Sequence, residues 1–155
     1  MGGSSTGGWS RLGDVRALEQ KAKEALNEGR RNVFISFTTE DMNEVNLLRA
    51  QAKNENNDIE FNDHSVREPY NSEQAEYIKR KISERINRAS VTVVFISDST
   101  AQSHWVKWEV EKSLELGKKV IAVHSGIHFG GILPKWISDN KIKMIPWSNL
   151  STELK

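Results

Sequence analysis

The sequence predicts an α/β fold in which a parallel sheet of five strands is flanked by helices. Five short runs rich in β-branched and aromatic residues alternate with segments whose apolar residues follow helical spacing. Such alternation is typical of a parallel sheet with helices on both faces. The run VTVVFIS at residues 91–97 is almost wholly apolar, as a central strand covered on both faces must be. At 155 residues, the chain suits one domain with a single core.

The N-terminal segment is predicted to lie outside that domain. Residues 1–11 are rich in Gly and Ser, which predicts a flexible leader, although the first six also fit the pattern for N-myristoylation. Residues 12–31 are predicted to form an extra N-terminal helix that ends at Gly29. Its apolar stripe is narrow and rich in Ala, which favours a helix packed on the outside of the domain, or an interaction arm.

The domain itself is predicted over residues 32–150, and its first half contains two strands. They are NVFISF at residues 32–37 and IEFN at residues 59–62, joined by a helix. A second helix follows a polar loop, and Asn71 or Ser72 is its predicted N-cap because short polar side chains satisfy free backbone N–H groups there.

The second half of the domain is predicted to add three strands, at residues 91–97, 119–124 and 143–146. The longest helix of this half lies between the first two, and one helical turn is expected near residues 135–138. Right-handed crossovers then give the flavodoxin-like strand order 2-1-3-4-5. Residues 151–155 are left as a tail.

In sheets of this kind, ligands bind beyond the carboxyl ends of the strands, near the point where the strand order reverses. The segments at those ends are Ser36–Phe37, residues 63–70, residues 97–103 and the residues from His124 onward. Trp105 and Glu109 lie one turn into the helix that follows the third of these segments. The sequence therefore predicts a site at this edge of the sheet.

Composition excludes several classes of function. The chain has 22 Lys and Arg against 21 Asp and Glu, so its net charge of +1 predicts no attraction to nucleic acid or acidic lipid. It has no cysteine, hence no thiolate ligand or nucleophile, and its four histidines are scattered, so no metal site is predicted. No apolar run is long enough to span a bilayer and no secretory signal is present, so we expect a cytoplasmic protein.

Two phosphate-related sites fit poorly. No glycine-rich loop follows the first strand, so a phosphate cradle is not predicted. A two-component receiver has this strand order, and Glu40–Asp41 and Asp98 partly fit its acidic residues. However, the first strand ends in Ser36–Phe37, and Pro146–Trp147 stands where a receiver has its lysine.

The pair Trp105 and Glu109 has two interpretations. The residues are four apart and share one helix face, with Lys112 and Ser113 nearby. Trp105 is either a packing residue, with Glu109 paired to Lys112 or Ser113, or the apolar wall of a site that uses the Glu109 carboxylate. Spacing alone favours the first interpretation.

Several motifs resemble TIR domains, in the order in which that family has them. NVFISFTTED is similar to the first signature box, WVKWE matches the W-x-x-x-E signature, KKVIAVH resembles the fourth strand, and ILPKW…IPW resembles the end of the domain. The resemblance covers roughly residues 32–147 and is strongest to the TIR-like subunit of Thoeris anti-phage systems. The loop DHSVREPYNSEQ differs from the RG-type loop of receptor TIR domains, which puts self-association through that loop in doubt.

The resemblance implies an NAD+ glycohydrolase or cyclase that produces a cyclic ADP-ribose-type signal for a separate effector. It implies NAD+ as substrate, no further cofactor, and self-association or contact with another TIR-type protein. Glu109 would be the catalytic residue. The implied substrate-binding residues are Ser36 and Phe37 on the nicotinamide side, Ser97 or Ser99 at ribose or phosphate, Arg67 at the pyrophosphate, and Trp105 as an apolar wall. The alternative is a non-catalytic TIR module that binds other TIR domains.

The chemistry is compatible with a single obvious carboxylate. Glycosidases normally use two, one of which protonates the leaving oxygen. The nicotinamide of NAD+ leaves as a neutral molecule without a proton, so one anionic side chain suffices to stabilise an oxocarbenium-like transition state.

Overall fold

The computed structural model describes residues 15–19, 31–55, 59–63, 70, 72–126 and 133–154. The chain divides into two units, Met1–Arg30 and Arg31–Lys155. In the first unit, residues 15–19 are helical, and Val15 and Leu18 are exposed. Arg31, the last residue of the predicted N-terminal helix, is instead the first residue of a strand. The rest of the predicted leader and N-terminal helix lies outside the described residues.

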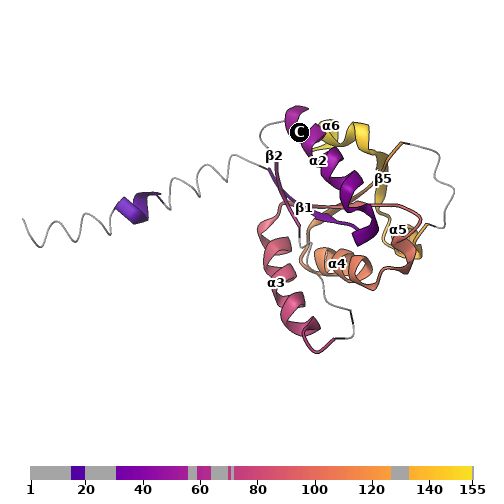
Figure 1. Ribbon diagram of the computed structural model, residues 1–155, viewed down its shortest axis with the longest axis horizontal. Helices are drawn as coiled ribbons and strands as arrows, with labels where there is room; N and C mark the ends of the chain where they lie inside the picture. Colours follow the sequence, from indigo (N-terminus) through magenta and orange to yellow (C-terminus); the bar gives the residue numbers. More distant parts are fainter. Residues whose placement is uncertain are drawn as a thin grey trace, which may run out of the picture. The chain divides into compact units, whose positions relative to one another are not determined.

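The second unit is built on a five-stranded parallel sheet with the order β2-β1-β3-β4-β5 (Figure 1). The strands are β1 (Arg31–Ser36), β2 (Ile59–Asn62), β3 (Val91–Phe95), β4 (Lys119–His124) and β5 (Lys143–Pro146). This confirms the predicted α/β fold and its strand order. Because β1 pairs with β2 on one side and β3 on the other, the order reverses between β1 and β3.

Helices connect the strands in every crossover. The α-helices are α2 (Met42–Glu55), α3 (Ala75–Arg88), α4 (His104–Glu115), α5 (Lys135–Asp139) and α6 (Leu150–Glu153). Three short 3₁₀ segments precede α2, α4 and α6: η1 (Thr39–Asp41), η2 (Thr100–Gln102) and η3 (Trp147–Asn149).

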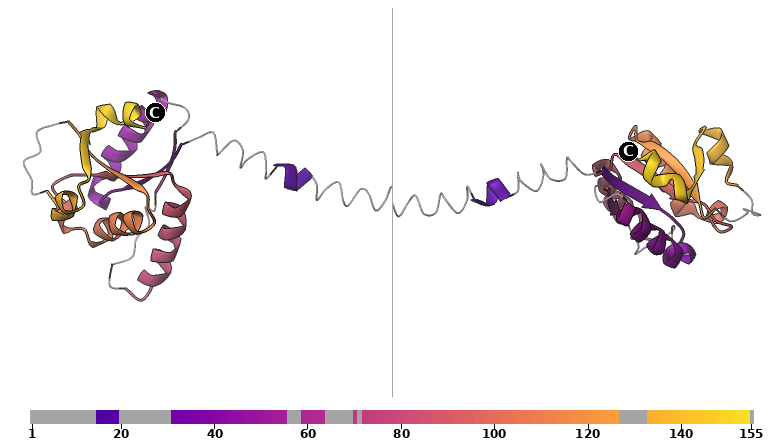
Figure 2. Two further views of the ribbon diagram at one scale, coloured as in Figure 1. Left: turned by 180° about the vertical axis from the view of Figure 1, so that it is seen from behind. Right: turned by 90° about the horizontal axis from the view of Figure 1, so that it is seen from above.

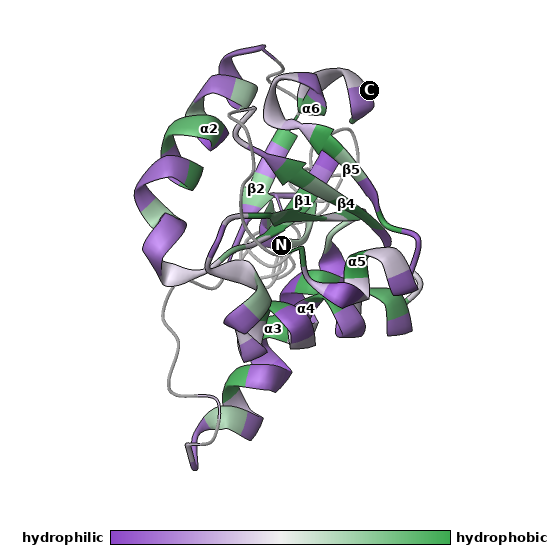
Figure 3. Ribbon diagram, turned by 90° about the vertical axis from the view of Figure 1, so that its right-hand side faces the viewer, coloured by the Kyte–Doolittle hydropathy of each residue, from purple (hydrophilic) through white to green (hydrophobic). Residues whose placement is uncertain are grey.

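The helices form two layers on opposite faces of the sheet (Figure 2). Val33, Ile35 and Phe37 belong to the core beneath α2 and α6, whereas Phe34 packs against α3. This alternation follows from the pleat of a strand, which points successive side chains to opposite faces. Colouring by hydropathy shows many apolar residues along the strands and a mixture of apolar and polar residues along the helices (Figure 3).

Two boundaries differ from the sequence prediction, namely the start of α3 and the C-terminal end of the domain. Helix α3 begins at Ala75 with Gln74 as its N-cap, so the predicted cap at Asn71 or Ser72 is wrong for Ser72, and Asn71 lies outside the described residues. At the C-terminus, Leu150 and Leu154 are buried at the ends of α6. The boundary expected after residue 150 therefore falls within a helix that packs on the core.

Candidate functional site

The reversal of strand order places the ends of β1 and β3 side by side. Helix α4 begins just beyond this point, because Ser103 is its N-cap and the Ser103 side chain accepts a hydrogen bond from the Val106 backbone N–H at 3.2 Å. The first turn of α4 is thereby fixed against the carboxyl edge of the sheet. This turn carries Trp105, and Glu109 follows one turn later.

Ser36 and Glu109 are joined by a hydrogen bond across this edge. The Ser36 hydroxyl, at the end of β1, donates to Glu109 Oε1 at 2.7 Å, and both residues are fully buried. They are 73 positions apart in the sequence, so only the fold brings them together. Glu109 makes at least one further interaction besides this hydrogen bond. A buried carboxylate that receives a hydroxyl donor at the strand-order reversal is suited to stabilising positive charge.

The backbone of Glu109 is also held in place. The Ser113 hydroxyl donates to the Glu109 carbonyl oxygen at 2.7 Å and lies 2.8 Å from the hydroxyl of Thr92 on β3. All three residues are fully buried. The chain of hydroxyl groups therefore ties α4 to β3 one turn beyond Glu109.

The structure also shows where the predicted structural partners of Glu109 lie. Lys112 Nζ pairs with Glu115 at 3.3 Å, and the Ser113 hydroxyl is bonded to the backbone rather than to the Glu109 carboxylate. The interpretation in which the Glu109 side chain is paired to Lys112 or Ser113 is therefore wrong, although Ser113 does bond to the Glu109 backbone. The other part of that interpretation, a packed Trp105, agrees with its 7% exposure.

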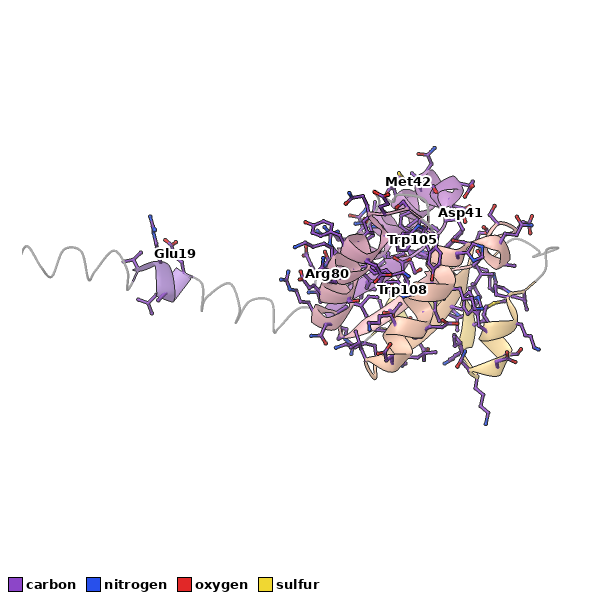
Figure 4. All side chains as sticks on the ribbon, turned by 90° about the horizontal axis from the view of Figure 1, so that it is seen from below. Glu19, Asp41, Met42, Arg80, Trp105 and Trp108 are labelled. Carbon is purple, nitrogen blue, oxygen red and sulfur yellow. The ribbon has the colours of Figure 1, made fainter. Side chains whose placement is uncertain are left out.

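Aromatic rings surround the start of α4. The Trp105 ring meets Trp108 edge to face with centroids 6.1 Å apart, and Tyr70 edge to face at 5.2 Å. Lys79 of α3 places its Nζ 4.5 Å from the centre of the Tyr70 ring and 5.7 Å from that of Trp108. Figure 4 shows Trp105 and Trp108 among the side chains of the second unit. The rings form a low-dielectric wall on the α3 side of α4, which strengthens electrostatic interactions nearby.

A second polar cluster, made by Thr38, Asp41, Ser97 and Ser99, lies at the ends of β1 and β3. Asp41 Oδ2 accepts hydrogen bonds from the Thr38 hydroxyl at 2.8 Å and from the Ser97 hydroxyl at 2.5 Å. The Ser97 oxygen in turn accepts the backbone N–H of Ser99 at 3.2 Å. The structure thus joins Ser97 to both Asp41 and Ser99. From the sequence, Asp41 was considered only as part of the acidic pair of a two-component receiver.

The remaining predicted site residues lie elsewhere. Phe37 follows Ser36 in an extended segment and points to the opposite face, into the core with Val45 and Trp147. Arg67 lies outside the described residues. The substrate contacts proposed for Phe37 and Arg67 therefore stay predictions.

Within the described ranges, the chain has neither a metal-ligand cluster nor a membrane-spanning helix. No three His, Cys, Asp or Glu side chains within them lie together as a metal site would require. No helix in the described part of the chain has both the length and the apolar character to cross a membrane.

A doubly wound sheet of this order, with a W-x-x-x-E helix beyond its strand-order reversal, defines a TIR-like domain. A sequence profile of the family described as "Thoeris protein ThsB, TIR-like domain" matches residues 34–127. That stretch is more than half of the 155 residues, and the chain belongs to this family.

One relative matches over a short stretch. "Putative cyclic ADP-D-ribose synthase ThsB1" from Bacillus cereus strain MSX-D12 is 43% identical over 47 residues. The match covers 30% of this chain and spans about a quarter, 24%, of the length of that protein.

Two solved structures resemble the chain in fold. A 2-deoxyribosyltransferase from Bacillus psychrosaccharolyticus superposes with a TM-score of 0.57 at 18% identity, over 79% of this chain and 95% of that one. At this identity the similarity concerns the fold alone. The TIR domains of the activated Roq1 resistosome superpose less well, with a TM-score of 0.44 at 22% identity over 63% of this chain and 59% of that one.

Proposed function

We propose that the protein cleaves NAD+ between nicotinamide and ribose and releases a cyclic ADP-ribose-type product that signals to a separate effector in anti-phage defence. The observation that carries the proposal is the fully buried Glu109, which receives the Ser36 hydroxyl at the strand-order reversal. Membership of the Thoeris TIR-like family supports it, as does the naming of the Bacillus cereus relative as a cyclic ADP-D-ribose synthase.

The reaction requires few protein groups. The bond between the ribose C1 and the nicotinamide nitrogen breaks, and its electron pair stays on that nitrogen, which turns the pyridinium into neutral nicotinamide. The carboxylate of Glu109 would stabilise the cation left on the ribose. Water or a nucleophilic group of the ADP-ribose moiety then adds to C1 and loses a proton, which gives ADP-ribose or a cyclic product.

Burial of the site bears on regulation. Glu109 has no exposed surface and Trp105 has 7%, so substrate reaches the carboxylate only after the edge of the site opens. We therefore propose that the resting protein turns NAD+ over slowly and accelerates when it is triggered or assembled, since loop rearrangements often control such steps. Contact with another TIR-type protein, or with a second copy, would be one such trigger.

The same burial favours a second candidate function. A fully buried glutamate bonded to a serine also fits a non-catalytic TIR module in which Glu109 only fixes α4 to β1. Such a module would act by binding other TIR domains.

Incubation with NAD+ separates the two candidates. Free nicotinamide and the mass of the nucleotide product are measured over a range of protein concentrations, to include assembled states. We expect release from the wild type and from Glu111→Gln, a control on the exposed side of α4, and almost none from Glu109→Gln. No release at any concentration, or equal release by Glu109→Gln, would contradict the catalytic proposal.

A further inference from the structure

Asp41 is a half-buried carboxylate held from two strands. Its Oδ2 accepts the hydroxyl of Thr38, which follows β1, and the hydroxyl of Ser97, which follows β3. The Ser97 bond, at 2.5 Å, connects residues 56 positions apart in the sequence. These bonds fix the direction of the carboxylate at the point where β1 and β3 diverge, the usual ligand-binding position in sheets of this order.

Asp41 and Glu109 are held by alternate residues of one extended segment. Ser36 ends β1, and Thr38 keeps an extended conformation with φ −79° and ψ 154°. Side chains two positions apart in extended chain point to the same side, and their Cα atoms are about 6.6 Å apart. Ser36 donates to Glu109 and Thr38 donates to Asp41, so this segment presents both carboxylates on the same side of β1.

One oxygen of Asp41 is available to a ligand. Both of these hydrogen bonds fall on Oδ2, and within the described residues Oδ1 accepts no hydrogen bond and no cation pairs with the carboxylate. A carboxylate with an unused oxygen accepts hydrogen bonds from hydroxyl groups and repels phosphate. In a dinucleotide, the neutral hydroxyl donors are those of the two riboses.

We propose that Asp41 is a substrate-binding residue whose Oδ1 accepts a hydrogen bond from a ribose hydroxyl of the dinucleotide, while Glu109 acts at the scissile bond. The inference rests on the proposed function, because that function supplies the substrate. Thr38 and Ser97 are positioning residues in this arrangement, since they act on the ligand through Asp41. Ser97 would thus serve the site without contacting ribose or phosphate itself.

The test measures binding and does not require turnover. Isothermal titration calorimetry with ADP-ribose, which keeps both riboses and has no nicotinamide bond, is carried out on the wild type, Asp41→Asn and Glu40→Gln. Analogues of ADP-ribose that each lack one ribose hydroxyl are titrated in parallel. Asn preserves the acceptor for Thr38 and Ser97 but removes the charge, and Glu40 is an exposed neighbour in the same turn. A melting curve checks that each variant is folded, and Asp41→Glu replaces Asp41→Asn if the latter does not fold.

We expect Asp41→Asn to weaken ADP-ribose binding by about tenfold or more, as loss of a charge-assisted hydrogen bond does, and Glu40→Gln to bind like the wild type. One analogue should lack the hydroxyl that Asp41 binds. The wild type should bind this analogue more weakly than ADP-ribose, and Asp41→Asn should bind it with the same affinity as the wild type does. Three results would overturn the inference. Asp41→Asn could bind ADP-ribose as tightly as the wild type, it could lose the same affinity for every analogue, or the wild type could fail to bind ADP-ribose.

Nicotinamide release measured on the same samples separates the inference from the proposed function. If the wild type releases nicotinamide but Asp41→Asn binds ADP-ribose as well as the wild type does, only the role of Asp41 is contradicted. Asp41-dependent binding without any release contradicts only the NAD+-cleaving activity.

Discussion

At the scale of single residues, Glu109 is unusual because it is a fully buried carboxylate that receives a serine hydroxyl. Burying a charged group is costly unless it is paired or hydrogen-bonded. Proteins retain such groups mainly where they act, which makes the Ser36–Glu109 pair the most informative contact in the molecule.

The substitution Glu109→Gln tests this residue. Gln keeps the size and the acceptor for Ser36 but removes the charge that would stabilise the ribose cation. We expect the rate of nicotinamide release to fall by about 10²–10³, and the Tm to stay constant or rise slightly because a buried charge is removed. Both quantities are measured on one preparation, with Glu111→Gln as the control. A lowered Tm with an unchanged rate would assign Glu109 to structure.

The sequence predicted where the candidate site lies in the fold, but it did not predict the contacts between its residues. Motif order and spacing predicted Ser36, Trp105 and Glu109 correctly as residues near one edge of the sheet. The direct Ser36–Glu109 bond was not predicted, because it joins residues 73 positions apart and depends on how α4 crosses the sheet. Asp41 was missed because an acidic residue at a helix start is common, and its bond to Ser97 is visible only in the folded chain.

At the scale of elements, α4 is positioned by a buried pair of hydroxyl groups. Thr92 and Ser113 are fully buried, and the bond between their hydroxyl groups connects β3 to α4. A polar pair of this kind specifies one arrangement of an otherwise apolar interface.

A double-mutant cycle with Thr92→Val and Ser113→Ala measures this connection. We expect each single change to lower the free energy of unfolding by about 1–3 kcal/mol. Ser113→Ala removes the partner of the Thr92 hydroxyl, and Thr92→Val removes one of the two hydrogen bonds of the Ser113 hydroxyl. The double variant should lose less free energy of unfolding than the two single variants lose together. We expect a coupling energy of about 0.5–1.5 kcal/mol from denaturant titration. Strict additivity would show that the two hydroxyls act independently.

Element boundaries were predictable where local signals end a strand. The strands at residues 59–62, 119–124 and 143–146 were predicted with the bounds that β2, β4 and β5 have in the structure. Helix α6 was missed because it has only four residues, and its burial comes from docking on α2. Its contacts include the Ser151 hydroxyl donating to Glu55 at 2.6 Å, a pairing that no local pattern encodes.

The attachment of α6 should depend on pH through Glu153. Hydrogen bonding and proximity to Lys143, with a further contribution from Lys119, hold the pKa of Glu153 below its ordinary value of 4.5. A carboxyl group with a lowered pKa stabilises the fold above the unfolded-state pKa, and that contribution disappears as the pH falls through the folded-state value. We expect Glu153→Gln to be slightly less stable than the wild type at pH 7, and the difference in urea titrations to vanish once the pH falls below the lowered pKa of Glu153. A difference that is constant with pH would exclude a role for the charge.

At the scale of the whole molecule, the two units of the chain should be separable. The second unit contains the entire sheet and the three buried clusters, whereas the described residues of the first unit are exposed. A variant lacking residues 1–30 should melt cooperatively, with a Tm within about 3 °C of the full chain, a shift that corresponds to roughly 1 kcal/mol. Insolubility or a broad transition would show that the N-terminal segment contributes to the core.

The docking of the C-terminal segment on α2 also determines the order in which the chain folds. The Trp147 indole donates to the Leu48 carbonyl at 3.1 Å across 99 positions, and Leu150 and Leu154 complete the same buried cluster. Closing so long a loop has a high entropic cost. The C-terminal segment should therefore dock on α2 only after neighbouring strands have paired through their shorter crossovers. Interactions that form after the transition state affect unfolding rates rather than folding rates. Stopped-flow measurements on Leu154→Ala should therefore show unfolding accelerated by at least tenfold and folding nearly unchanged, whereas slowed folding would place this helix in the nucleus.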